Sequence, residues 1–184
     1  MVASNTCGLN GPEIYYRQTQ NQQSPWNANS RNLRYTCDSG SSHQSHSAKF
    51  LTDNEAETTW WQSETLYQSQ IQYPNNVTLS LDLDKAYEIT YIRLKFHSPR
   101  PESMMIEKRT CATCPWVKYQ YYSNTCMDTF MVADGGYVRM ENEREALCDS
   151  KMSKISPLSG GEIVFPTLEG KTQNFALCQL SEIF

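Results

Sequence analysis

The stretch that decides the fold is Phe50–Arg109, FLTDNEAETTWWQSETLYQSQIQYPNNVTLSLDLDKAYEITYIRLKFHSPRPESMMIEKR. From residue 77 to 83 (VTLSLDL) every second residue is apolar, which is the period of a β-strand that buries one face. Residues 92–97 (IRLKFH) alternate in the same way. We therefore predict two half-buried strands, joined by a connection around residues 84–88.

A glycosylation acceptor lies at the start of the first predicted strand. Asn76 opens the sequon Asn-Val-Thr. Because side chains alternate between the faces of a strand, Asn76 shares the wet face with Thr78 and Ser80. A glycan there would point away from the core, so we predict that Asn76 is glycosylated if the chain is secreted.

Composition narrows the class of protein. A length of 184 residues with 39% hydrophobic and 20% charged residues is typical of one globular domain. A formal net charge of −4, with no dense basic run, argues against a nucleic-acid partner. No apolar run reaches the length of a membrane span, and the first residues lack the pattern of a signal peptide.

The cysteines favour an oxidising compartment. Seven are present, which is many for a cytosolic chain of this size. Secretion without a visible signal peptide leads us to expect that the given start is a boundary within a longer gene product. The odd number leads us to expect either a free thiol or a partner cysteine beyond the given ends.

Outside the two strands the pattern is less regular. Residues 17–47 are rich in Gln, Asn and Ser and are predicted to form a long irregular loop pinned at Cys37. The best helical candidate is Asn142–Cys148, which begins with a possible N-cap. The apolar run Ile163–Phe165 is predicted to be a strand.

The loop after Phe50 carries the residue types of a calcium site. Asp53 precedes Thr58 by five positions and Trp60 by seven, after a strand-like Phe50-Leu51. A carboxylate, a threonine oxygen and nearby carbonyls are ligands that Ca²⁺ accepts. The same residues also suit an ordinary Asx turn followed by core tryptophans, and spacing does not separate the two.

Two further patterns point to chemistry only weakly. Cys111-Ala-Thr-Cys114 has the spacing of a redox pair or half a zinc site, but also of a local disulfide. His43 and His46, in a polar loop, are expected to be solvated.

The chain has no nucleophile elbow, P-loop or dinucleotide glycine pattern, and no paired catalytic acids are evident, so we expect no enzyme.

Several motifs together resemble one family. They are FLTD at 50–53, TTWWQSE at 58–64, ITYIRLKFH at 89–97, RPES at 100–103, YQYYS at 119–123 and ISPLSGG at 155–161. They resemble the laminin N-terminal domain (domain VI), with gamma-type laminin chains most similar. The resemblance runs from about Asn5 to Gly170, so we delimit the domain as 5–170 and residues 171–184 as an off-pattern tail.

The resemblance implies an all-β fold: a jelly-roll β-sandwich of galactose-binding-like architecture with long loops, here missing its last strands. It implies a secreted module of the basement membrane, a structural component of the extracellular matrix that supports cell adhesion. Its partners would be the N-terminal domains of laminin alpha and beta chains, which polymerise with it in a calcium-dependent node, and other basement-membrane proteins.

It also implies site residues. Calcium would bind in the loop with Phe50, Asp53 and Thr58, of which Asp53 is the best single ligand. A surface loop would contact other laminin N-terminal domains, through Pro157, Leu158, Gly161 and Glu162. Ser159 and Gly160 replace residues that some alpha chains carry there.

The cysteines follow the family in part. The gamma pattern has cysteines where Tyr16 and Arg34 stand, and the loss of both predicts that Cys7 pairs with Cys37. Cys126 with Cys148 follows the family pattern. Cys111 and Cys114 have no counterpart and are predicted to bond to each other, which leaves Cys178, in the tail, unpaired.

Two other functions compete with laminin assembly. Netrins share the domain, so the chain could be a secreted ligand or an antagonist of laminin networks, although netrins match these motifs less well. Galactose-binding-like sandwiches often bind sugars, so glycan recognition is a third hypothesis.

Overall fold

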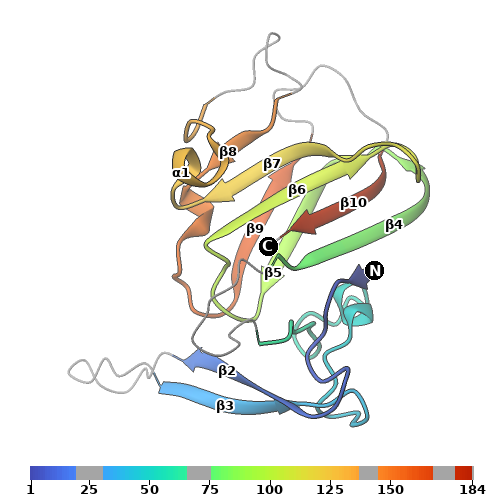
Figure 1. Ribbon diagram of the computed structural model, residues 1–184, viewed down its shortest axis with the longest axis vertical. Helices are drawn as coiled ribbons and strands as arrows, with labels where there is room; N and C mark the ends of the chain where they lie inside the picture. Colours follow the sequence, from blue (N-terminus) through green and yellow to red (C-terminus); the bar gives the residue numbers. More distant parts are fainter. Residues whose placement is uncertain (20–30, 66–75, 137–144, 168–176, 184) are drawn as a thin grey trace.

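The protein is a β-sandwich of two sheets with a separate β-ribbon at one end (Figure 1). This computed structural model describes residues 1–19, 31–65, 76–136, 145–167 and 177–183, the last of these by their backbone alone. The larger sheet has six strands, in the spatial order β1 (Val2–Ala3), β4 (Thr78–Tyr87), β10 (Leu177–Ile183), β6 (Ser103–Arg109), β7 (Val117–Ser123) and β8 (Leu147–Asp149). Neighbours are antiparallel except β7 and β8, which are parallel.

The second sheet covers the first and closes the core. It consists of β5 (Tyr91–Phe96) and β9 (Gly161–Pro166), paired antiparallel. Residues of β9 alternate strictly between buried and exposed. The buried cluster joins the two sheets, with Met104, Ile106, Tyr119, Tyr122, Ile163 and Phe165. Burial of each such side chain contributes about 1.5–3 kcal/mol, so this seam holds the two layers together.

The two strands predicted from alternation are confirmed. Val77 and Leu79 are 2% and 4% exposed, and Ile92, Leu94 and Phe96 pack against the core. The first strand is longer than predicted, because β4 continues to Tyr87, which pairs with Leu177 of β10. The pairing shifts register near Asp84, whose φ of 62° marks an irregular position. Asn76 is exposed just before β4, and its glycosylation stays a prediction.

The prediction of a loop over residues 17–47 is wrong for residues 17–19 and 31–37, which are strands, whereas residues 38–47 form no helix or strand. β2 (Glu13–Thr19) and β3 (Arg31–Cys37) pair antiparallel as a ribbon, while residues 20–30 lie outside the described part. The ribbon forms because its aromatic and β-branched residues favour extended backbone. Tyr15 is buried against the Cys7–Cys37 disulfide in a small core of its own.

The predicted helix at 142–148 and the predicted strand-like segment at 50–51 both have a different conformation in the structure. Within the described part of Asn142–Cys148, Leu147 and Cys148 belong to β8 instead of a helix, since Cys148 pairs with Tyr121 of β7; residues 142–144 are not described. A short helix, α1 (Cys126–Phe130), follows β7, and a 3-10 turn, η2 (Lys151–Ser153), follows β8. Phe50 and Leu51 lie in the 3-10 turn η1 (Ala48–Leu51).

The C-terminal segment contributes a strand that the sequence analysis did not predict. β10 lies between β4 and β6 and pairs antiparallel with both. Part of the segment set apart as a tail therefore belongs to the main sheet. Its other residues, 171–176 and 184, and the proposed boundary at Gly170 lie outside the described residues.

Candidate functional site

A tight loop after η1 holds Asp53. One carboxylate oxygen, Oδ1, accepts the N–H of Glu55 at 2.9 Å, and Oδ2 accepts the hydroxyl of Thr59 at 2.7 Å. Asn54 between them adopts a φ of 62°, in the left-handed region that Asn tolerates. The Glu55 N–H and then the Thr59 hydroxyl lower the pKa of the Asp53 carboxyl. Asp53 is therefore a carboxylate anion at neutral pH.

The Asp53 carboxylate is hydrogen-bonded to Thr59, the residue that follows the predicted ligand Thr58. The Thr58 hydroxyl donates to the carbonyl oxygen of Glu55 at 3.2 Å, and Thr59 instead faces the Asp53 carboxylate. Phe50 lies in η1, where its N–H donates to Ser47. Nothing in the sequence distinguishes Thr58 from Thr59 as the hydrogen-bond partner of Asp53.

The donor chemistry of this loop fits a hard cation. Each carboxylate oxygen of Asp53 accepts one of these bonds and keeps a further lone pair. Across the described residues, the one group of three His, Cys, Asp or Glu side chains with ligand atoms within 4.8 Å of one another is Cys7, Glu13 and Cys37, where the two sulfurs form a disulfide. A cation at Asp53 would therefore take its other ligands from hydroxyl, carbonyl and water oxygens.

Behind the loop, the indole of Trp60 lies between two imidazoles. The ring of His46 stacks on it at 4.4 Å between centroids, and the ring of His97 meets it edgewise at 4.2 Å. The Tyr15 hydroxyl of β2 is hydrogen-bonded to His46 Nε2 at 3.2 Å. The prediction that His46 is solvated is wrong, because it is 8% exposed, whereas His43 is exposed as predicted.

A positive charge borders this stack. The guanidinium of Arg17 lies 5.5 Å from the Trp60 ring centroid, and it donates to the carbonyl oxygen of His97 at 3.5 Å. Burial lowers the pKa of both His46 and His97, and the charge of Arg17 lowers each pKa further. His97 Nε2 is buried with no hydrogen-bond partner among the described residues. Both imidazoles are therefore neutral at pH 7.

Three further contacts fix the loop in place. The indole N–H of Trp61 donates to Thr6 Oγ1 at 3.1 Å, and the N–H of Cys7 donates to the carbonyl of Gln62 at 2.8 Å. The Glu57 carboxylate forms an ion pair with Lys95 of β5. The loop is thus attached to the N-terminal segment on one side and to the sandwich on the other.

The loop with the predicted partner-binding residues is held by Arg100 of the RPES motif. Its guanidinium donates to the carbonyls of Lys154 at 3.2 Å and Ser156 at 2.7 Å. The Ser156–Pro157 peptide bond is cis. Gly160 donates to the carbonyl of Phe96 at 2.8 Å, which ties the loop to the end of β5.

The four named residues of this loop differ in exposure. Pro157 and Glu162 are exposed, Leu158 is partly exposed and Gly161 is buried. A Cβ on Gly161 would lie 3.4 Å from the Arg100 side chain, at ordinary van der Waals distance, so the Arg100 stem packs against this position. Glu162 forms an ion pair with Arg93, the residue two positions before Lys95 on β5.

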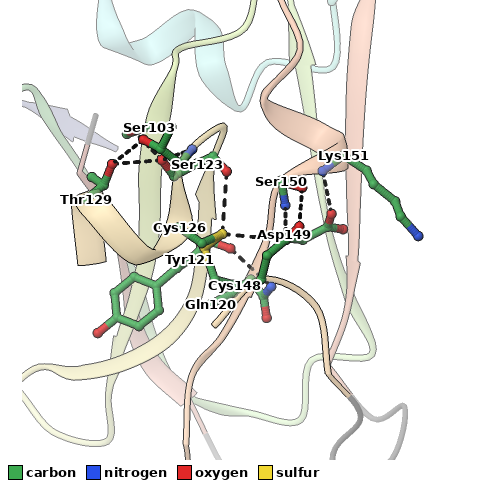
Figure 2. Close-up of a disulfide and its surroundings, with 12 residues drawn as sticks. Ser103, Gln120, Tyr121, Ser123, Cys126, Thr129, Cys148, Asp149, Ser150 and Lys151 are labelled. Atoms are coloured by element: carbon green, nitrogen blue, oxygen red, sulfur yellow. Dashed lines mark hydrogen bonds between the residues drawn. A yellow bond between two sulfur atoms is a disulfide. The ribbon is translucent and has the colours of Figure 1, made fainter. Parts of the chain in front are cut away.

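Three disulfides are present, in the same pairs that the sequence analysis named. Cys7 bonds to Cys37, Cys111 to Cys114 and Cys126 to Cys148. Figure 2 shows the last of these, which fastens α1 to β8 beside a chain of hydroxyls. In that chain Ser103, Ser123 and Thr129 are joined by contacts of 2.9 and 3.0 Å between Oγ atoms.

Comparison with known proteins settles the family. The sequence profile of the laminin N-terminal domain (Domain VI) matches residues 1–182. The chain belongs to the laminin N-terminal family. That match includes most of the segment set apart as a tail, from residue 171 to 182.

Laminin gamma subunits are similar over most of the chain. Human laminin subunit gamma-1 is 47% identical over 174 residues, which cover 93% of this chain and 10% of that protein. Mouse laminin subunit gamma-3 is 51% identical over 138 residues, covering 73% and 9%. The laminin-like protein lam-2 of Caenorhabditis elegans is 41% identical over 170 residues, covering 91% and 10%. The chain thus spans about a tenth of these relatives.

Membership assigns the broad class. Laminin N-terminal domains are modules of structural extracellular-matrix proteins, so this laminin-type chain is not an enzyme. Among the described residues, no helix is long and apolar enough to cross a membrane.

The buried histidines predict a loss of stability in acid. The folded pKa values of His46 and His97 lie below the unfolded value of about 6.5, so the unfolded chain takes up protons first as the pH falls. Their contribution to the free energy of unfolding is complete above that value and falls as the pH drops below it. Thermal unfolding between pH 7.5 and 5, with an NMR titration of both imidazoles, measures this.

Arg17→Met removes the neighbouring charge and keeps an apolar stem. Both histidine pKa values should rise, and the acid loss of stability should shrink. Arg34→Met is the matched control, because Arg34 of β3 pairs with Tyr16 and not with the Tyr15 beside the stack. Equal effects of the two variants on the histidine pKa values would contradict the assigned role of Arg17.

Proposed function

We propose that this chain is an assembly module of a secreted laminin of the basement membrane, which joins the N-terminal domains of alpha and beta chains in a calcium-dependent polymer. The observation that carries the proposal is the match to laminin gamma subunits over almost the whole chain. Three disulfides in a chain of this size suit an extracellular compartment. The gamma-type relatives favour assembly over a netrin-type ligand.

The calcium part of the proposal rests on the Asp53 loop. The Asp53 carboxylate would be the charged ligand, with threonine and carbonyl oxygens of residues such as Thr58 and Phe50 completing the shell. Bound Ca²⁺ supplies a positive charge that links several oxygens of one loop. Contacts of Trp60, Trp61 and Glu57 already anchor the loop. Bound Ca²⁺ would make the anchored loop more rigid, so that it presents a fixed surface to a partner.

The partner part rests on the loop around Leu158. Pro157 and Glu162 are exposed, and the Arg100 contacts hold the backbone in one conformation. A pre-organised loop with a partly exposed apolar side chain loses little entropy on binding, which favours association.

Asp53→Asn tests the calcium site. In wild type we expect calcium to raise the thermal midpoint, through binding to the folded state alone. Asp53→Asn should keep the turn, since an amide oxygen also accepts the Glu55 N–H, but should lose most of that increase. Titration calorimetry and thermal unfolding with calcium or with chelator measure it.

Asp38→Asn is a matched control, because Asp38 Oδ1 accepts the N–H of Gly40 at 2.8 Å in a turn of the same kind. It should respond to calcium as wild type does. A full calcium response in Asp53→Asn would rule out Asp53 as a principal ligand.

Leu158→Ser tests the partner surface. Mixed with the N-terminal domains of a laminin alpha and a laminin beta chain, wild type should associate in calcium and dissociate in chelator. Leu158→Ser should weaken association by at least about fivefold, as expected for loss of an apolar interface contact. Sedimentation velocity measures the complexes.

Ile155→Ser is the control, because Ile155 is 62% exposed in the same loop but outside the proposed contact residues. Association that persists in chelator would refute the calcium dependence. An equal loss in both variants would refute the role of Leu158.

A further inference from the structure

The connection between β6 and β7 carries a disulfide unlike the other two. Cys7, Cys37, Cys126 and Cys148 are each at most 2% exposed. Cys111 and Cys114 are both partly exposed, in the turn of the hairpin. Exchange requires a thiolate to reach a sulfur atom, so accessibility favours this pair among the described disulfides.

This disulfide also contributes least to the fold. It spans a sequence separation of 3, against 22 and 30 for the other two. In the chain-entropy description, a disulfide stabilises less when the loop it closes is shorter. The strands on either side pair through their own backbones, from Ser103 with Ser123 to Lys108 with Val117. Opening the disulfide would leave that pairing in place.

The surroundings suit a thiolate on either sulfur. The Thr110 hydroxyl lies 3.7 Å from Cys114 Sγ, and the Thr113 hydroxyl lies 3.6 Å from Cys111 Sγ. Hydrogen bonds from hydroxyl donors stabilise a thiolate relative to its thiol.

We propose that Cys111–Cys114 is a thiol–disulfide exchange site that reacts with a thiol in solution. The incoming thiolate attacks one Sγ and forms a mixed disulfide with it. The bond between Cys111 and Cys114 breaks, and the other sulfur leaves as a thiolate that takes up a proton. The step conserves the number of disulfides and needs no external oxidant. This function is independent of calcium binding and laminin assembly.

The test exposes the folded, oxidised chain to reduced glutathione, followed by acid quenching, alkylation and peptide mapping. Each cysteine is assigned from its own peptide, so a reaction at Cys178 is counted separately. We expect a glutathione adduct on Cys111 or Cys114, with the other one alkylated, at least about tenfold faster than opening of either buried disulfide. Opening of all three disulfides at one rate, or of Cys111–Cys114 last, would overturn the proposal.

The double variant Cys111→Ser/Cys114→Ser separates exchange from stability. It should form no adduct at the hairpin and should unfold at nearly the wild-type temperature. Cys126→Ser/Cys148→Ser is the comparison, and it should lose about 2–5 kcal/mol of stability. If the hairpin variant loses as much stability as the comparison, the disulfide is structural and the proposal fails.

Discussion

The stack of His46, Trp60 and His97 is the interaction on which the rest of the candidate site depends. It joins segments that are far apart in the sequence, and Arg17 of β2 closes it from the ribbon side. Aromatic pairs of this kind are worth about 0.5–1.5 kcal/mol each beyond their burial. Since Trp60 follows Thr59 directly, the stack also sets the position of the loop that holds Asp53. Burial favours the neutral form of both imidazoles, so their protonation in acid opposes this packing.

Strand β5 connects the two proposed functional loops. Lys95 forms an ion pair with Glu57 of the Asp53 loop, and His97 follows the strand into the Trp60 stack. On the same strand, Arg93 forms an ion pair with Glu162, and the carbonyl of Phe96 accepts the N–H of Gly160. The Asp53 loop and the loop around Leu158 are therefore both attached to the same strand. Within the proposed function, this shared strand offers a physical link between calcium binding and assembly.

Part of this structure follows from local sequence patterns. The alternation in 77–83 and 92–97 predicts which faces of β4 and β5 are buried, because side-chain direction in a strand depends only on parity. The family resemblance predicts the sandwich, the matrix module and the Cys126–Cys148 pair, while departures from the family pattern predict the other two pairs. Local patterns failed where apolar and polar residues follow no sustained period, as in the ribbon strands β2 and β3, and where the partner strands are distant, as for β10 between β4 and β6. His46 lies in a polar loop and is buried by Tyr15 and Trp60, neither of which is near it in sequence.

The most direct test of the Asp53 loop as the calcium-responsive element is hydrogen exchange, followed by mass spectrometry, on the chain with calcium and with chelator. Calcium should slow amide exchange in peptides covering residues 50–62, with weaker protection at the end of β5. Unchanged exchange in residues 50–62, with protection elsewhere or nowhere, would contradict a calcium site at Asp53.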